Sequence, residues 1–328
     1  MSAHTTAGDD RTGERLTPLA SPAESWADRK TRLTLRSAEW LGMHLPRPAG
    51  LKAAELYHRV YFARAVKERE TAANNLSRVL GHPPDSPLVR KATRECFLLY
   101  GRYWYETFAL RSMTPDEVDR RFTLDGREHI DAALDAGRGI VLTLPHMGNW
   151  DAAGHWLCLK GYRVTAVAEE LKPASVFDLF LRHRRALGLN IVPLSEDRKI
   201  GNLLVRLLSE NHIITLVADR DLTGRGVTVQ MFDAPRKLPA GPAYLSLATG
   251  VPLCICAVFT TAEGWHCQIN PPARIERTGV MRDDVTALTR VIATQFERFI
   301  SAVPTDWHMF QPAWDGEEVL PSRASASS

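Results

Sequence analysis

Residues suited to acid–base chemistry lie together in the segment Leu144-Pro-His-Met-Gly-Asn-Trp-Asp151, between an apolar run and a helical pattern. Within it, four residues separate His146 from Asp151. Across a tight turn from a strand to a helix, that spacing can bring the carboxylate onto one imidazole nitrogen, which leaves the other nitrogen basic and aimed as a general base. Gly148 would let the backbone approach a ligand closely. Equally, Asp151 could cap the helix while His146 is an ordinary loop residue.

A metal site is a third interpretation of the same segment. Asp151 and His155 stand four residues apart on one face of the predicted helix, so with His146 they could share an ion. No further cluster of His, Asp or Glu follows at metal-site spacing, and we expect no metal. The sequence also lacks G-x-S-x-G and a cysteine beside a polar turn. A histidine base would therefore act on a substrate hydroxyl, without a covalent enzyme intermediate.

Two further segments carry charges where a site could form. Asp219-Arg-Asp-Leu-Thr-Gly-Arg-Gly226 directly follows an apolar run, which places Arg220 and Arg225 in a turn rich in glycine. The other segment, Leu181 to Gly188, is a basic cluster at the end of a helical pattern and includes Arg184. Each could bind phosphate groups. The first could instead be a solvated loop, and the second could simply complement a helix dipole.

The elements that must position these residues follow from periodicity. Helices are expected at 22–45, 51–80 and 86–113; prolines end the first, and a glycine with two prolines ends the second. Further along, strands are expected at 139–144, 164–168, 191–194, 213–218, 227–232, 251–260 and 266–270, and helices at 152–160, 174–187, 200–210, 241–249 and 282–303. This alternation predicts an α/β fold with a central, mostly parallel sheet flanked by helices, preceded by an N-terminal helical arm. Sites in such sheets sit at the carboxyl ends of strands.

The same patterns divide the chain. We expect a disordered tail at 1–20, a membrane-associating helical region at 21–122, an α/β domain at 123–315 and a second disordered tail at 316–328.

Composition narrows the class of protein. The 328 residues are 45% hydrophobic and carry a formal net charge of +3, which argues against a nucleic-acid-binding polycation. No apolar run approaches the roughly 18 residues of a membrane span, and no secretory signal is visible. The five cysteines are scattered without a C-x-x-C and suit a reducing compartment. We expect a protein inside the cell, soluble or bound to a membrane surface.

Charge is nevertheless unevenly distributed. Residues 29–67 hold nine Lys and Arg against Glu39 and Glu55, and this basic stretch also carries Leu33, Leu35 and Trp40. Such a make-up is typical of an interfacial helix with a basic rim, which suits an anionic membrane surface. An amphipathic helix packed on the protein core has the same pattern.

Several motifs in order, taken together, resemble the lipid A late acyltransferase family, within the glycerolipid acyltransferase superfamily and its H-x4-D/E motif. The resemblance covers roughly residues 53–315 and is strongest to the actinobacterial phosphatidylinositol mannoside acyltransferases. The motifs are Asn75-Leu-Ser-Arg-Val-Leu-Gly81, Tyr103-Trp-Tyr-Glu106, Pro145-His-Met-Gly-Asn-Trp-Asp151, Arg184-Arg-Ala-Leu-Gly188, Asp219-Arg-Asp-Leu-Thr223, Pro239-Ala-Gly-Pro-Ala243 and Asp306-Trp-His-Met309.

The resemblance implies roles for particular residues. His146 would be the base and Asp151 its orienting partner, and Arg184 would line the acyl-donor site. Asp219 matches a position that is glutamate in the mannoside enzymes and is treated there as catalytic, so this chain has the shorter acid. It also has Met231-Phe-Asp233 where relatives carry Phe-Phe-Gly.

The chemistry that the resemblance implies is transfer of a long-chain, palmitoyl-like acyl group from acyl-CoA to a mannose hydroxyl of a phosphatidylinositol mannoside. Backbone N–H groups near Gly148 and Asn149 are the expected donors to the oxyanion. Arg184, with Arg220 or Arg225, would bind the phosphates of CoA. Acyl-CoA would be a co-substrate and no cofactor is expected.

The expected place of action is the cytoplasmic face of the plasma membrane, as a peripheral protein, because both the acceptor and the product are lipids. The alternatives are acyl transfer to another glycolipid, such as a lipid A precursor, and a lipid-binding relative without catalysis.

Overall fold

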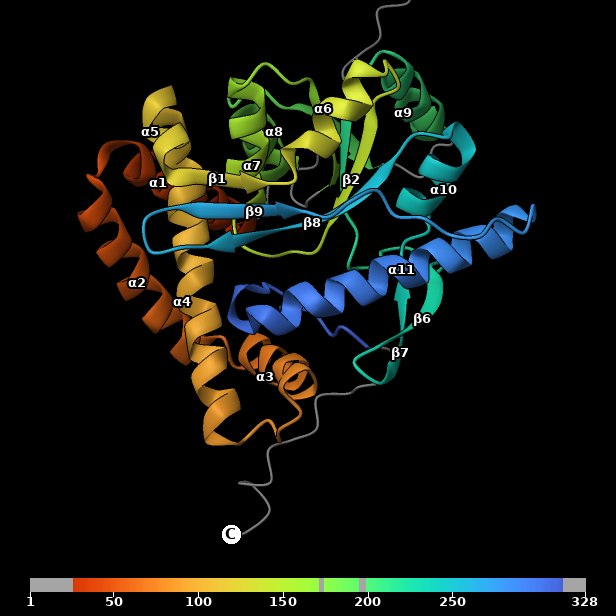
Figure 1. Ribbon diagram of the computed structural model, residues 1–328. Coiled ribbons are helices and arrows are strands. Elements are labelled where there is room, and N and C mark those ends of the chain that lie inside the picture. Colours follow the sequence, from red (N-terminus) through yellow and green to blue (C-terminus); the bar gives the residue numbers. More distant parts are fainter. Residues whose placement is uncertain (1–25, 171–173, 195–198, 315–328) are drawn as a thin grey trace, which may run out of the picture.

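The computed structural model describes residues 26–170, 174–194 and 199–314 (Figure 1). Both expected terminal tails lie outside these residues. The predicted fold class is confirmed: a seven-stranded sheet has the order β1-β9-β8-β2-β5-β3-β4, and only the β8–β9 pair is antiparallel. The strands are β1 (Phe122–Asp125), β2 (Ile140–Leu144), β3 (Val164–Glu169), β4 (Asn190–Leu194), β5 (Ile213–Val217), β8 (Leu253–Thr260) and β9 (Trp265–Ile269).

Helices cover both faces of this sheet because its central strands are apolar on both sides. On β2, Val141 packs on one face, whereas Ile140 and Leu142 pack on the other. The first face carries α9 (Lys199–Ser209), α10 (Gly241–Thr249), α11 (Met281–Ala302) and the hairpin of β6 (Val227–Met231) and β7 (Ala234–Leu238). The second face carries α5 (Pro115–Arg121), α6 (Arg127–Asp135) and α7 (Trp150–Leu159). The sequence patterns had not indicated β1, β7, α5 or α6.

The N-terminal helices are α1 (Trp26–His44), α2 (Arg47–Arg64), α3 (Val66–Leu80) and α4 (Pro87–Ala109). The prediction of one helix over 51–80 is wrong, because the backbone breaks at Ala65 (φ −83°, ψ 67°) and separates α2 from α3. Neither Gly nor Pro marks this break. Ala65 is buried against Phe97 of α4, so packing between the helices decides where the chain bends.

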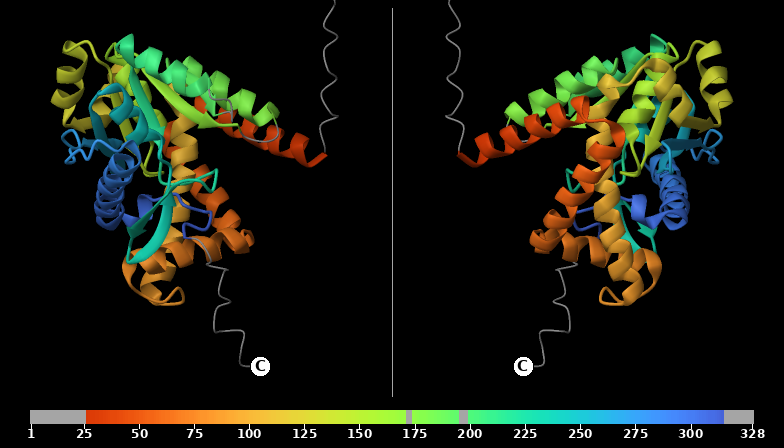
Figure 2. Two further views of the ribbon diagram at one scale, coloured as in Figure 1. Left: turned by 90° about the vertical axis from the view of Figure 1, so that its right-hand side faces the viewer. Right: turned by 90° about the vertical axis from the view of Figure 1, so that its left-hand side faces the viewer.

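Both α1 and α2 pack against α4 through close approaches at glycine. A Cβ at Gly50 would lie 2.0 Å from the Tyr105 ring, and one at Gly42 would lie 2.6 Å from Cβ of Phe108. Beyond α4, α1 extends outward beside α8 (Ala174–Ala186), as Figure 2 shows. One face of each helix therefore belongs to the core, and the opposite face is open.

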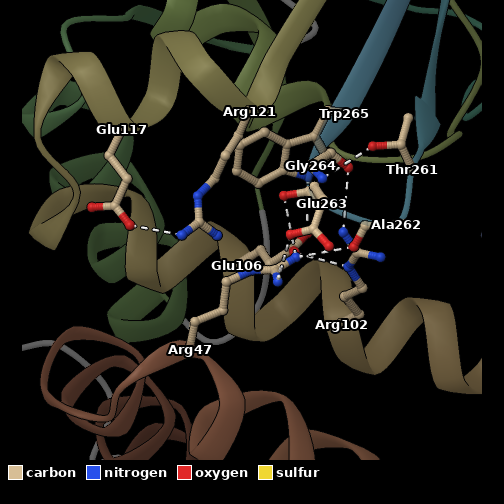
Figure 3. Close-up of polar contacts among 10 residues, drawn as sticks. All are labelled: Arg47, Arg102, Glu106, Glu117, Arg121, Thr261, Ala262, Glu263, Gly264 and Trp265. Atoms are coloured by element: carbon tan, nitrogen blue, oxygen red, sulfur yellow. Dashed lines mark hydrogen bonds and ion pairs between the residues drawn. The ribbon is translucent and has the colours of Figure 1, made fainter.

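A buried carboxylate joins this helical region to the sheet. Glu106 of α4 accepts hydrogen bonds from Arg102 (Nε–Oε1, 2.8 Å) and from the Trp265 indole (Nε1–Oε2, 2.9 Å), and Arg47 of α2 lies 3.4 Å from Oε1 (Figure 3). Arg47 also donates to the carbonyls of Ala262 and Glu263 in the β8–β9 turn. Charged pairs of this kind are costly to break from one side, because the remaining charge stays buried.

Replacing Glu106 by Gln should therefore destabilise the protein by about 3–5 kcal/mol, since two arginines lose their anionic partner inside the protein. Urea unfolding followed by circular dichroism measures this. The matched control is Glu117→Gln, which removes the partly exposed Glu117–Arg121 pair drawn in the same view and should cost at most about 1 kcal/mol. Equal losses in the two variants would contradict a special role for Glu106.

Candidate active site

Two neighbouring strands bring together residues that are distant in sequence. β2 and β5 pair in parallel with Leu144 opposite Val217, so His146 and Asp219 each lie two residues beyond the last pair. Nδ1 of His146 lies 2.5 Å from Oδ1 of Asp219, and the backbone N–H of His146 donates to Oδ2 at 3.0 Å. The two predicted site segments thus meet at the carboxyl edge of the sheet, as the position of sites in parallel sheets requires.

Asp219 is fully buried, whereas the His146 side chain retains 29% of its exposure. Burial disfavours the charged carboxylate, but the imidazole of His146, the Arg236 guanidinium and the Trp307 indole outweigh it and hold the pKa of Asp219 well below its usual range. An ionised Asp219 on Nδ1 leaves Nε2 as the imidazole nitrogen available to a substrate. That is the arrangement of a histidine base with an orienting carboxylate.

The expected pairing of Asp151 with the imidazole is wrong. Asp151 instead accepts Nε and Nη2 of Arg184 at 2.6 and 3.2 Å and the Tyr103 hydroxyl at 3.0 Å. Asp151 is the second residue of α7, and its side chain packs against Arg184 of α8 rather than reaching the loop that holds His146. Because these three donors already bind its carboxylate, Asp151 forms a structural ion pair and does not orient the His146 ring.

In this second buried cluster, Asp151, Arg184 and Tyr103 all have shifted pKa values. Burial opposes ionisation of Asp151, yet Arg184 and Tyr103 keep its pKa below the ordinary value. Although burial acts in the opposite direction, the negative charge of Asp151 raises the pKa of Arg184 above its ordinary value. Burial raises the pKa of the Tyr103 hydroxyl. Arg184 thus balances Asp151 and is not a free cation, in contrast to the expected phosphate clamp.

Of the two expected oxyanion donors, the Gly148 N–H already has an acceptor, and the side chain of Asn149 caps α7. The Gly148 N–H donates to the Asp306 carbonyl at 3.1 Å, and a Cβ at this residue (φ +56°) would lie 2.2 Å from the Val258 carbonyl oxygen. Gly148 therefore permits a close approach to β8 rather than to a ligand. Asn149, not Asp151, is the N-cap of α7, with its Oδ1 accepting the Ala152 N–H at 2.9 Å.

The remaining predicted residues lie further out. Arg220 is ion-paired with Glu169, whereas among the described residues no carboxylate pairs with Arg225. His155 bonds the Leu187 carbonyl through Nδ1 at 2.8 Å and does not meet His146 or Asp151. In the parts of the chain that the structure covers, no three His, Cys, Asp or Glu side chains are grouped to hold a metal ion.

A cavity of about 980 Å³ opens beside His146. Its inner part, between α7 and the sheet, is apolar and is lined by Phe122, Leu124, Leu142, Leu144, Ala153, Leu157, Cys256, Val258, Cys267 and Ile269. Its outer part includes polar and exposed side chains, namely Lys67, Glu68, Glu169, Arg220, Leu222 and Arg225. His146, Asp151 and Arg184 line the same space. A long apolar ligand with a polar head would match these two parts.

The segment 306–309 forms hydrogen bonds to the loop that carries His146 and to Asp219. Besides the Asp306 contact to Gly148, the His308 N–H donates to the His146 carbonyl at 2.8 Å, and the Trp307 indole donates to Oδ2 of Asp219 at 2.8 Å. The His308 ring is buried beside Tyr103, and burial lowers its pKa to about 3, so this ring is neutral. The segment therefore fixes both members of the His146–Asp219 pair.

The model of the family described as bacterial lipid A biosynthesis acyltransferase matches residues 35–315. The chain belongs to this family. It is 40% identical over 285 residues, 85% of this chain and 87% of the other, to a phosphatidylinositol mannoside acyltransferase of Mycobacterium tuberculosis (strain CDC 1551 / Oshkosh). It is 39% identical over 246 residues, 75% and 79% of the two chains, to the protein of the same name from Mycolicibacterium smegmatis (strain ATCC 700084 / mc(2)155). The resemblance inferred from the motifs is confirmed.

Sequence patterns did not assign a role to three buried residues of this family member. Tyr103 and Trp307 both lie inside motifs that carry the resemblance, but a motif does not show what its side chains contact. Arg236 lies on β7, a strand that the sequence patterns had not indicated, and it donates to the Asp219 carbonyl. Only the folded chain places these side chains around the two carboxylates.

Asp306 should make stability depend on pH. Burial raises the pKa of this carboxyl to about 6, one of its oxygens accepts the Thr260 N–H at 2.7 Å, and the other has no hydrogen-bond partner among the described residues. Between about pH 4 and about pH 6 the folded state therefore binds more protons than the unfolded state, so stability falls as the pH rises through this window, by up to about 3 kcal/mol.

Asp306→Asn removes this titration while its amide oxygen can still accept the Thr260 N–H. The free energy of unfolding of the variant minus that of the parent protein should therefore rise by up to about 3 kcal/mol from about pH 4 to about pH 7. Urea titrations across this range measure it. A difference that stays constant with pH would show that folding does not raise the pKa of Asp306.

Proposed function

We propose that this acyltransferase moves a long-chain, palmitoyl-like acyl group from acyl-CoA to a mannose hydroxyl of a phosphatidylinositol mannoside, with His146 as the general base. The observation that carries the proposal is the His146–Asp219 pair beside a cavity with an apolar inner part. The acceptor rests on the printed names of the relatives at about 40% identity.

The geometry supports direct transfer. Nε2 of His146 takes the proton of the hydroxyl as its oxygen bonds to the thioester carbonyl carbon. The C–S bond then breaks, and the imidazolium returns its proton to the departing thiolate, giving an ester and free CoA. Ionised Asp219 stabilises the imidazolium through Nδ1. A hydrogen bond with Cys267, together with burial, raises the pKa of the Cys256 thiol well above its ordinary value, so this thiol in the cavity lining is not an activated nucleophile.

The two parts of the cavity suit the two ends of the proposed donor. The acyl chain would occupy the inner part between α7 and the sheet, where its methylene groups leave water. The CoA phosphates would lie at the outer part, where Arg225 and Lys67 are exposed. Arg184 and Arg220 contribute less charge there, because each already balances a carboxylate.

His146→Ala should lower acyl transfer by roughly 10²–10⁴-fold while leaving the fold intact, since only the base is lost. The assay supplies palmitoyl-CoA with mixed mannosylated phosphoinositides, measures thiol release with and without acceptor, and identifies products by mass spectrometry. The matched control is His155→Ala, which removes a histidine of α7 that bonds a backbone carbonyl and does not line the cavity, and this variant should retain activity. Retained transfer in a folded His146→Ala protein would falsify the mechanism.

The same assay separates the alternatives. The family description favours a lipid A precursor as the second candidate acceptor. Product formed only with that glycolipid would replace the mannoside in the proposal, and transfer only from an acyl carrier protein would replace CoA. Lipid binding without thiol release for any acceptor or donor would identify a non-catalytic relative.

We also propose that the chain acts as a peripheral protein at the cytoplasmic face of the plasma membrane. In residues 26–170, 174–194 and 199–314, no helix is long and apolar enough to cross a bilayer. The open face of α2 instead exposes Leu56 (66%), Tyr57 and Val60 among the basic residues Lys52 and Arg59. Apolar side chains with a basic rim suit an anionic leaflet.

This surface continues towards the site. Tyr61 of α2 and Lys67 of α3 line the cavity, and α1 exposes Leu33 (60%) and Trp40 (57%). A lipid acceptor could thus reach His146 from a membrane in contact with α2. The inner faces of α1 and α2 pack on α4, as expected for amphipathic helices packed on the protein core. The proposed membrane contact concerns only their open faces.

Leu56→Glu combined with Val60→Glu should weaken binding to vesicles that contain phosphatidylinositol by roughly tenfold or more, because two apolar contacts are replaced by charges that the leaflet repels. Vesicle flotation measures this. Val280→Glu, at an exposed apolar residue before α11, is the matched control and should float like the parent. Point changes are preferable to deletion of residues 1–50, which would remove Arg47 and Gly50 from their contacts with α4. Unchanged flotation of the double variant would exclude α2 as the contact surface.

A further inference from the structure

The carboxylate of Asp219 has a donor at each side. Oδ1 faces Nδ1 of His146 at 2.5 Å, and Oδ2 accepts both the His146 backbone N–H at 3.0 Å and the Trp307 indole N–H at 2.8 Å. Only the indole donor comes from outside the catalytic pair. Rotation of the Asp219 side chain would break its hydrogen bond, so the indole fixes the direction in which Oδ1 points.

Arg236 forms the next layer. Its side chain is 3% exposed, its guanidinium lies 5.4 Å from the ring centroid of Trp307 and 5.3 Å from that of Trp314, and it donates to the backbone carbonyl of Asp219. Burial lowers its pKa to about 10, and it remains a cation at neutral pH. Within the described residues no carboxylate forms an ion pair with it, and Asp219 is the acid that its charge acts on.

Neither Trp307 nor Arg236 is among the described residues that line the cavity. We propose that Trp307, backed by Arg236, is a positioning residue for the reaction: its indole N–H holds Asp219 in the orientation that aims and tunes His146, without contact to either substrate. This inference rests on the proposed function of His146 as the base. It assigns a role to the Asp306-Trp-His-Met309 motif, which the sequence left without one.

The electrostatic consequence has a definite sign. The indole N–H and the Arg236 cation both stabilise negative charge on Asp219. Without either one, the carboxylate attracts the proton on Nδ1 of His146 more strongly. Among the described residues, the segment 306–309 also brings the neutral ring of His308 and the carboxyl of Asp306, whose pKa is about 6, close to His146. The Asp151–Arg184 pair of α7 and α8 is balanced, and burial raises the pKa of the Tyr103 hydroxyl of α4. These groups do not change in the variants below.

The test compares two buried tryptophans. Trp307→Phe removes the donor to Asp219, whereas Trp314→Phe removes an indole that donates to the Met231 carbonyl at 3.0 Å and stacks on the same Arg236. Both variants replace an indole by the smaller phenyl ring in the same core cluster. Loss of packing alone therefore affects them alike, and loss of positioning affects only Trp307→Phe.

For Trp307→Phe we expect kcat to fall roughly 10- to 100-fold, from the loss of one hydrogen bond to a charged group. KM for donor and acceptor should change less than about twofold, and the acid limb of kcat/KM should move to higher pH. Trp314→Phe should keep the parent's pH profile. Arg236→Lys should lie between the parent and Arg236→Met, which should move the acid limb in the same direction as Trp307→Phe.

A second measurement does not depend on turnover. The proton between Nδ1 of His146 and Asp219 should give a downfield resonance that is absent in His146→Ala, shifted in Trp307→Phe and unchanged in Trp314→Phe. The same pH profile and the same resonance in both tryptophan variants would overturn the positioning role, even with active enzyme. Retained transfer in His146→Ala would instead overturn the proposed function, and the resonance would still report whether Trp307 holds Asp219. Thermal unfolding identifies a variant that fails to fold. If Trp307→Phe fails to fold, the pH profiles of Arg236→Lys and Arg236→Met test the positioning role instead.

Discussion

The parallel pairing of β2 with β5 is the constraint on which the site depends. It sets Leu144 opposite Val217, and the chain then leaves both strands at the same level, so that His146 and Asp219 meet two residues later. A carboxylate fully out of water at this point must find donors for its oxygens or lose its charge. The segment 306–309 supplies the indole of Trp307 as a donor to Oδ2. Arg236 of the β6–β7 hairpin donates to the backbone carbonyl of Asp219 and places a positive charge near the carboxylate.

The same requirement recurs at two other buried carboxylates. Asp151 is balanced by Arg184 and Tyr103 in the cavity wall, and Glu106 joins the helical region to the β8–β9 turn. Asp306 differs, because in the part of the chain that the structure describes one of its oxygens has no hydrogen-bond partner, and burial raises its pKa. The carboxylates of Asp219, Asp151 and Glu106 thus mark places where separate elements are joined, and each has a partner from another element.

The cavity lies where the helical region meets the sheet. Its inner part is formed by α7 and apolar strands, and its outer part by α2, α3 and the turn after β5. The helical region therefore has two surfaces with different tasks, one packed on α4 and one open. An enzyme that must bury an acyl chain and also meet a lipid acceptor needs both an apolar interior and an apolar outer face, which the N-terminal helices provide together with the sheet.

By itself the sequence determined the fold class, most strands and helices, the segments that carry the site and the family, because periodicity and motifs are local properties. It also contained the right acids, but assigned Asp151 to the imidazole from its proximity along the chain. Only the tertiary structure decided that Asp219 is the partner of His146, since strand order is set by packing of distant segments. The break at Ala65, the role of Gly148 against β8 and the donors Trp307 and Arg236 were decided in the same way.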